Sequence, residues 1–366
     1  MPLRSRRGSL LSDSGQMVSN KFILHYGNLA GWPYQFAKGL RDVGYDSTNV
    51  MAETADVEDL DRRLPFDRTL HVGKPSKIVS IAKRAAFFAS VANKVGLVHY
   101  HSGVILPARM HPMVEGAIFQ KLDVPMVMTF GGGEARIISQ ARALTPYFYL
   151  QPDEKRDAWT RNSLATMSKR IRFVATDCEM ATFVKPYFEK VFTLRQPVDL
   201  AKFPFVEPEV DRPPVFLHIP THAWAKGTKY ILAAVERLKS EGYRFEFRTR
   251  EKLTQAQMYS ELAACDVYVD ELLCGAHGVT AVEAMATGKP AITYIRPDLV
   301  SQYPPDLPLV NANPDTIYEM MRCLISEPSW RRQLSYDGRA YAEKYHDAKL
   351  VVQDLISMYR EIGWKG

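Results

Sequence analysis

The segment 275–290, which reads GAHGVTAVEAMATGKP, constrains the fold more than any other part of the chain. A glycine-bounded loop leads into a short helix with its apolar positions on one face, and the Gly and Pro near the end of the segment stop this helix. An apolar strand over 291–295 follows at once. A glycine loop at a helix N-terminus presents free backbone N–H groups and the positive end of the helix dipole, and both suit a phosphate. The segment therefore predicts an anion site, with Glu283 one turn further along, where a carboxylate can accept hydrogen bonds from ribose hydroxyls.

Short apolar runs and helix-like segments alternate along the rest of the chain. The apolar runs predict strands over 22–26, 48–52, 96–100, 125–130, 172–175, 191–194, 215–218, 245–248 and 267–269. Helices are predicted over 33–43, 76–93, 112–122, 227–240, 255–264, 316–325, 330–345 and 348–362. This alternation favours parallel sheets with helices on both faces.

The length of 366 residues, nearly half of them apolar, suggests two domains, each with its own core. A proline-rich linker near residue 205 divides the pattern. We expect a disordered basic tail over 1–19, a Rossmann-like domain over 20–205 and a second Rossmann-like domain over 206–345. The last segment, 346–366, is expected to be a helix that crosses back to the first domain. Ligands of such folds bind at the carboxyl ends of the strands, so the two domains should face each other across a cleft.

The composition excludes some classes of protein and leaves others open. The four cysteines lack metal-ligand spacing, and no apolar run reaches the length of a membrane span. The N-terminus does not read as a secretory signal, so we expect a cytoplasmic protein, with the inner face of the membrane as an alternative position. A net charge of +6 is compatible with an ordinary solvated surface, and equally with phosphorylated ligands, an anionic membrane surface or nucleic acid. The acidic segment Asp59-Leu60-Asp61 is interpreted as a solvated patch rather than a metal site.

The segment 275–290 resembles the donor-binding motif of retaining GT-B glycosyltransferases of the family 4 type, which reads EA-x-A-x-G-x-P. The matching residues are Glu283, Ala284, Ala286, Gly288 and Pro290. The alternative is an ordinary capped amphipathic helix in an unrelated α/β protein. The resemblance implies two doubly wound domains facing across a cleft. It also implies transfer of a sugar from a nucleotide-sugar donor to an acceptor hydroxyl, with retention at the anomeric carbon and without a metal or other cofactor.

The resemblance also assigns roles to residues of the second domain. Lys226 is expected to place its ammonium on the donor diphosphate, and the backbone amides of Gly278, Val279 and Thr280 are expected on the phosphates. Relatives add an arginine a few residues before the lysine, and His222 is the nearest donor that this chain offers there.

The paired glutamates of the family, spaced E-x7-E, are only half present. The second matches Glu283, whereas the first falls on Gly275. A carboxylate for the donor sugar must then come from elsewhere, with Asp270, Glu271 or the amides near Gly278 as candidates.

In the first domain, the run TFGGGEAR ends a predicted strand. Relatives carry a histidine where this chain has Gly131, whereas Glu134 and Arg136 match the family pattern and are expected to line the sugar pocket. His99 and His101 alternate along the strand before it and share one face. We assign the catalytic role to His101, with a purely structural histidine as the alternative.

The loop before the first helix contributes Gly31 and Trp32, which border the donor phosphates in the family. Trp32 can stack on a sugar or pack beneath the loop.

The expected partners are a nucleotide sugar and an unidentified hydroxyl acceptor, which can be a glycan, a lipid-linked molecule or a small molecule. Peripheral membrane contact is left open, and nucleic acid is not favoured. Two alternative functions remain: a degenerate nucleotide-sugar-binding protein without transferase activity, and a glycosyltransferase acting on modified nucleic acid.

Overall fold

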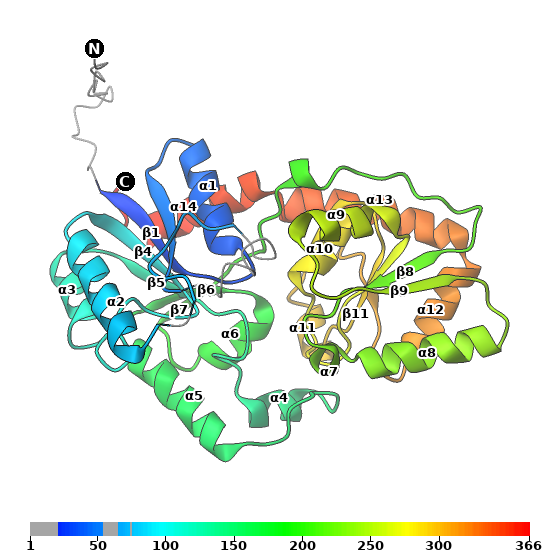
Figure 1. Cartoon of the computed structure of the whole chain (residues 1–366), viewed down its shortest axis with the longest axis horizontal. Helices are drawn as coiled ribbons and strands as arrows, with labels where there is room; N and C mark the ends of the chain where they lie inside the picture. Colours follow the sequence, from blue (N-terminus) through cyan, green and yellow to red (C-terminus); the bar gives the residue numbers. More distant parts are fainter. Residues whose placement is uncertain (1–20, 54–64, 74) are drawn as a thin grey trace, which may run out of the picture.

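The computed structural model describes residues 21–53, 65–73 and 75–366, which form two parallel β-sheets flanked by helices (Figure 1). The predicted tail over 1–19 and the segment Asp59-Leu60-Asp61 lie outside the described residues. In this described part of the chain, no helix is long and apolar enough to cross a membrane.

The first sheet has seven strands in the order β3-β2-β1-β4-β5-β6-β7, and each neighbouring pair is parallel. The strands are β1 Phe22–Gly27, β2 Ser47–Met51, β3 Arg68–Thr69, β4 Val95–His101, β5 Met126–Thr129, β6 Phe173–Thr176 and β7 Lys190–Thr193. Because every neighbour is parallel, the carboxyl ends of all seven strands meet at one edge.

Two layers of helices cover the first sheet. Helices α1 (Trp32–Asp42) and α14 (Ala348–Glu361) bury their apolar residues together against one face. The opposite face is covered by α2 (Lys77–Val91) and α3 (Glu115–Lys121), whose phenylalanines join the other core cluster. Three further helices follow β5 and β6: α4 Ile138–Leu144, α5 Glu154–Met167 and α6 Cys178–Val184.

The second sheet has five parallel strands in the order β12-β11-β10-β8-β9. Its strands are β8 Val215–His218, β9 Glu246–Thr249, β10 Val267–Val269, β11 Ala291–Thr293 and β12 Val310–Asn311. Its helices are α7 Ala223–Lys226, α8 Thr228–Ser240, α9 Gln255–Ala264, α10 Val279–Ala286, α11 Pro297–Val300, α12 Ile317–Ser326 and α13 Pro328–Tyr345.

The chain passes between the two sheets at two points that lie side by side. The N–H of Val198 donates to the carbonyl of His346 at 2.8 Å, and the N–H of Ala348 donates back to Val198 at 2.9 Å. After the second crossing, α14 packs on α1 of the first sheet (Figure 1). The two halves are therefore joined by a pair of adjacent backbone segments.

The structure confirms the predicted strands and the predicted helices, with shifts of at most three residues at their ends. Sequence reasoning missed the two-residue strands β3 and β12, the helices α4, α5 and α6, and the four-residue helices α7 (Ala223–Lys226) and α11 (Pro297–Val300). Helix α5 was hidden because polar residues, Asp157 and Thr160, occupy part of its buried face. The Asp157 carboxylate accepts hydrogen bonds from the N–H groups of Ile138 and Ser139 at the start of α4, which explains its burial.

Candidate functional site

A cavity of about 370 Å³ lies between the carboxyl ends of the two sheets. The loops after β1, β5, β6 and β7 line it from the first half, and the loops after β8 and β10 line it from the second. The residues predicted for the site that line this cavity are Trp32, Arg136, His222, Lys226, Gly278 and Val279. The structure thus brings together groups that are up to 247 positions apart in the sequence, from Trp32 to Val279.

Lys226, at the end of α7, lines this cavity and forms an ion pair with the buried Asp270. Its Nζ lies 2.6 Å from Oδ1 of Asp270, and the other carboxylate oxygen of Asp270 accepts the N–H of Gly278 at 2.8 Å. The Lys226 side chain keeps 24% of its surface exposed, whereas Asp270 is fully buried. Burial acts to lower the pKa of Lys226, but the carboxylates of Asp270 and Glu271 outweigh it and raise that pKa. The ammonium is therefore held charged, with hydrogens left to face the cavity.

Gly278 caps the N-terminus of α10, and the first turn of this helix points its N–H groups away from the helix body. Gly278 and Val279 both line the cavity. Asp270 shows that an anion can be held here, since its single carboxylate contacts both Lys226 and the cap N–H. A phosphate beside these groups would meet an ammonium and a helix N-terminus at once.

Glu271 supplies a second buried carboxylate in the cavity wall. It is 4% exposed, and it accepts the N–H groups of Cys274 at 2.9 Å and Gly275 at 3.1 Å. Burial raises the pKa of Glu271 to about 7. This carboxylate therefore contacts the backbone at the position where the family pattern places its first glutamate.

Gly275 itself cannot carry a side chain in this fold. Its φ is +93°, and a Cβ there would lie 2.0 Å from Cγ of Arg296. Arg296 is fully buried, pairs with Asp298 at 3.0 Å and reaches Thr182 of the other half at 3.3 Å. Arg296 thus occupies the space that a side chain at position 275 would need.

On the cavity wall formed by the first half, the Arg136 guanidinium forms a bidentate ion pair with the Glu179 carboxylate, and both N–O distances are 2.8 Å. Both side chains line the cavity. Asp177 lies beside them, and burial together with the Glu179 charge raises the pKa of Asp177 to about 6. The two cations of the cavity wall, Lys226 and Arg136, are therefore each paired with a carboxylate.

The Glu134 side chain forms hydrogen bonds with the glycine run after β5 instead of lining the cavity. Its carboxylate accepts the N–H groups of Gly131 and Gly132 and the hydroxyl of Ser102. Glu134 is half-buried and is not among the described residues that line the cavity. Its observed contacts hold the turn after β5 in shape.

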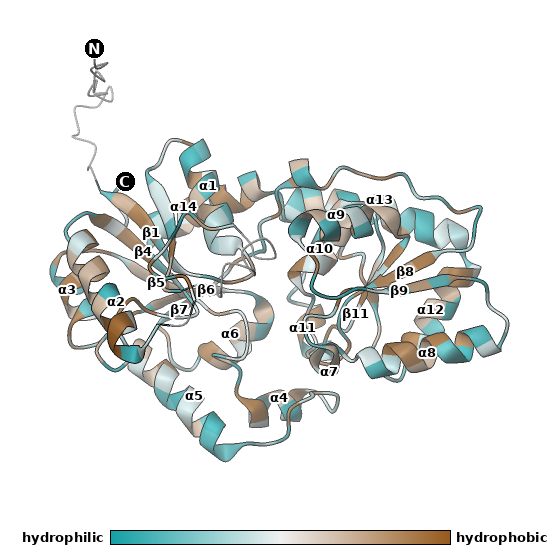
Figure 2. Cartoon of the chain, viewed as in Figure 1, coloured by the Kyte–Doolittle hydropathy of each residue, from teal (hydrophilic) through white to brown (hydrophobic). Residues whose placement is uncertain are grey.

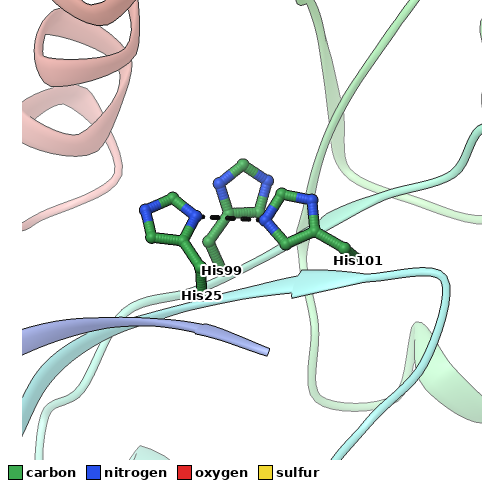
Figure 3. A group of neighbouring side chains, drawn as sticks. All are labelled: His25, His99 and His101. Carbon is green, nitrogen blue, oxygen red and sulfur yellow. Dashed lines mark hydrogen bonds between the residues drawn. The ribbon is translucent and has the colours of Figure 1, made fainter. Parts of the chain in front are cut away.

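Three buried histidines of the first half lie close together (Figure 3). His25 on β1 and His101 on β4 approach with ring nitrogens 3.1 Å apart, and one ring nitrogen from each of the three histidines lies within 4.8 Å of the others. Both nitrogens of His99 are engaged, by Tyr359 of α14 at 2.6 Å and by Thr129 at 2.7 Å. Burial lowers the pKa of all three well below the ordinary value, to about 3 for His25.

This cluster is a neutral network that joins α14 to β1, β4 and β5. His101, 1% exposed, is not among the described cavity-lining residues, so it does not reach the position that the prediction gave it. Because β4 alternates, His99 and His101 do share one face as predicted, but that face packs under α1 and α14.

Trp32 and His222 belong to opposite walls of the cavity. Trp32 is only 3% exposed, and its Nε1 has no partner among the described residues. His222 is exposed and lies 6.0 Å, between ring centroids, from Trp224. Trp224 in turn meets Tyr149 of the other half, with 4.9 Å between the ring centroids, so aromatic rings from both halves are in contact here.

Three other predicted residues, Gly31, Thr280 and Glu283, are not among the described residues that line the cavity, although Gly31 and Thr280 are next to lining residues in the sequence. Gly31 takes a φ of +79° at the start of α1. Glu283 is half-buried one turn into α10, and burial raises its pKa to about 7.

Sequence reasoning missed Asp177, Glu179, Gln196 and His277, which all line the cavity. Asp177 and Glu179 directly follow a strand end, which was the available signal.

Comparisons with known proteins bear on the fold. The sequence matches no family model and no curated protein. The structure is similar to sucrose-phosphate synthase from Thermosynechococcus elongatus, with a TM-score of 0.66 and 16% identity over 93% of this chain and 99% of that one. It is also similar to HepE from Anabaena in complex with UDP-glucose, with a TM-score of 0.63 and 13% identity over 93% and 99% of the two chains.

A third similar structure is an alpha-glucosyltransferase in complex with UDP-glucose and DNA containing an abasic site. Its TM-score is 0.60, with 8% identity over 92% of this chain and 98% of that one. These proteins share little sequence with the chain but almost its whole architecture. The chain therefore has the GT-B glycosyltransferase fold, with two parallel-sheet units facing each other across the cavity described above.

Proposed function

We propose that the chain is a glycosyltransferase that moves a sugar from a nucleotide-sugar donor to an acceptor hydroxyl. The observation that carries this proposal is the position of Lys226, whose ammonium lines the cavity beside the N-terminus of α10. Ligands of doubly wound folds bind at this edge of the sheet. The similar structures with UDP or UDP-glucose support a nucleotide-sugar donor.

The donor diphosphate contacts the Lys226 ammonium and the backbone N–H groups of Val279 and Thr280. Asp270 acts as a positioning residue, because it holds both the ammonium and the helix cap in place. Glu283, one turn along α10, accepts hydrogen bonds from the ribose hydroxyls.

Two groups of the opposite walls complete the phosphate site. The loop at Gly31 and Trp32 borders the phosphates from the first half. His222 adds a hydrogen-bond donor where relatives carry an arginine.

The donor sugar lies between Arg136 and Glu271, on opposite walls of the cavity. The Glu271 carboxylate accepts a hydrogen bond from a sugar hydroxyl. It replaces the first glutamate of the family pattern, for which there is no space at Gly275. Glu134 and His101 support this pocket from behind, through the glycine turn and the buried histidine network.

The reaction proceeds with retention. The acceptor hydroxyl attacks the anomeric carbon on the face from which the diphosphate leaves, the bond to the phosphate oxygen breaks, and the hydroxyl proton passes to the donor phosphate. Preorganised cations and N–H groups stabilise the negative charge that grows on the leaving group, and this is their catalytic contribution. We propose that no metal ion is needed, because the ammonium and the helix N-terminus hold the diphosphate.

A second candidate is a protein that binds a nucleotide sugar without transferring it. The observation that favours it is that both cations of the cavity wall are already paired with carboxylates, Lys226 with Asp270 and Arg136 with Glu179. A diphosphate that enters such a site meets little uncompensated positive charge.

The test is incubation with UDP-, ADP- and GDP-linked hexoses, with release of nucleoside diphosphate as the readout. Release that persists in excess EDTA supports the transferase without a metal. Calorimetric binding of a nucleotide sugar without any release supports the second candidate. If no nucleotide sugar binds, both are wrong. Product anomers identified by proton NMR would decide between retention and inversion.

A further inference from the structure

Exposed apolar side chains gather on one part of the first half of the molecule. Among the described residues, 14 large hydrophobic side chains are exposed, and 7 of these lie between residues 72 and 118. Ile78 is 81% exposed and Met113 is 74% exposed. The others in this stretch are Val72, Val79, Ile81, Met110 and Ile118. Half of the exposed apolar side chains therefore occupy a short stretch of the chain.

Helix α2 has an apolar stripe on its outer face. Its inner face is formed by Phe87, Phe88 and Val91, which are buried in the core. On the outer face, Ile78 is followed by three exposed alanines at helical spacing, Ala82, Ala85 and Ala89. A surface helix that packs on a sheet with one face typically carries polar residues on the other, and this apolar stripe is exposed among the described residues.

The segment before α3 extends this apolar surface. Figures 1 and 2 show α2 and α3 next to each other, with hydrophobic colouring on both, and the rings of Phe88 and Phe119 meet at 5.3 Å. The Arg84 guanidinium donates to the carbonyls of Val104 at 2.8 Å and Leu106 at 3.1 Å, which fixes the segment after β4 against α2. Met110 and Met113 follow directly in this segment.

The position of this surface relates it to the cavity. Helix α2 begins after β3, and the methionine segment begins after β4, so both leave the sheet at its carboxyl edge. The cavity lies at the same edge. The N-terminal end of α2 and the methionines therefore lie at the cavity side of the first sheet.

The lysines and arginines of the same stretch are not accompanied by acidic residues. Between residues 68 and 114 the sequence contains seven lysines and arginines and no aspartate or glutamate. The next carboxylate, Glu115, is fully buried and accepts the Tyr100 hydroxyl and the N–H groups of Ile105 and Leu106. Lys77, Lys83 and Arg109 are exposed among the apolar residues.

We propose that this surface, formed by Val72, Ile78, Val79, Ile81, Met110 and Met113 with Lys77, Lys83 and Arg109, docks on an anionic lipid bilayer. Apolar side chains that project between basic ones match the interface of such a bilayer, where acyl chains lie beneath negatively charged headgroups. The absence of exposed carboxylates over this stretch removes the repulsion that anionic headgroups would otherwise meet. Docking in this way turns the cavity edge of the first sheet towards the membrane, and it does not depend on the proposed activity.

The test is co-sedimentation of the full chain with vesicles of phosphatidylcholine alone and with added phosphatidylglycerol, at low and high salt. We expect binding to the anionic vesicles that weakens in high salt, and little binding to the neutral ones. The variant Ile78→Glu/Met113→Glu should bind at least about tenfold more weakly, because two exposed apolar groups no longer enter the bilayer. The control Leu232→Glu changes a residue that is 42% exposed on α8 of the other half, and it should bind like the original chain.

Circular dichroism and thermal unfolding check that both variants remain folded, since all three changed side chains are exposed. The proposal is overturned if the original chain does not bind anionic vesicles, or if it binds neutral vesicles equally well. It is also overturned if Ile78→Glu/Met113→Glu binds as strongly as the control. Binding of nucleotide sugars is measured separately, so failure here and failure of the proposed function give different results.

Discussion

Replacement of Lys226 by alanine should reduce both stability and catalysis, and the structure allows the two effects to be separated. The variant leaves Asp270 fully buried without the cation that lies 2.6 Å away. Breaking a buried ion pair costs about 3–5 kcal/mol, but the Lys226 side chain is 24% exposed and water screens part of the interaction. We therefore expect a loss of about 1–3 kcal/mol of unfolding free energy.

The catalytic effect should be larger than the effect on stability. One preorganised donor to the leaving group is worth on the order of a hundredfold in kcat. The assay is release of nucleoside diphosphate at saturating donor, with urea unfolding measured on the same preparations. Lys229→Ala is the matched control, because Lys229 is exposed on α8 only three positions away.

The double variant Lys226→Ala/Asp270→Asn separates the two effects. Asparagine removes the unpaired charge and still offers an oxygen to the N–H of Gly278, so stability should return towards the original value. Catalysis should stay low, because the ammonium is still missing. Recovery of kcat in the double variant would refute the reasoning, since Lys226 would then matter only for the fold. A fall of less than threefold in Lys226→Ala would assign the diphosphate to another group, with His222 next to be tested.

Three further variants test other parts of the account. Glu283→Gln should weaken nucleotide-sugar binding about tenfold or more at pH 8, where the carboxylate with its pKa of about 7 is ionised, and calorimetry measures this directly. Glu271 should make the protein less stable as the pH rises from about 4.5 to about 7, because the unfolded chain ionises this group first while burial keeps the folded group protonated. Glu271→Gln should therefore flatten the pH dependence of urea unfolding over this range, and an unchanged slope would contradict the raised pKa. Tyr359→Phe should cost about 1–3 kcal/mol of unfolding free energy, because buried His99 loses the hydroxyl 2.6 Å from its Nδ1, and an unchanged urea midpoint would contradict the importance of the histidine network.

The architecture could be predicted from the sequence because its strongest patterns are local. A strand followed by a glycine turn and a helix appears in the residues themselves, and the order of ten such strands favoured two parallel sheets. Helix α5 could not be predicted in this way, because its buried Asp157 is satisfied by backbone N–H groups of α4, which only the folded chain brings near.

The site was predictable where it follows a motif and unpredictable where it depends on pairing in space. Lys226 and Gly278 follow from the motif, and both line the cavity. Their shared partner Asp270 was only one of several candidates, because the sequence does not show which carboxylate reaches across from β10. His101 was assigned to the cavity because it lies at the end of a strand. However, His101 and His99 share one face of β4, and that face lies beneath α14. Helix α14 begins 247 positions after His101, so the sequence does not reveal this contact.

The central claim is that a nucleoside diphosphate is held between Lys226 and the first turn of α10. The most direct measurement is a crystal structure of the chain with a bound nucleotide sugar. We expect the diphosphate oxygens within hydrogen-bond distance of the Lys226 Nζ and of the N–H groups of Val279 and Thr280, with the Lys226–Asp270 pair preserved. A nucleotide bound outside this cavity, or one whose phosphates face away from Lys226, would contradict the account.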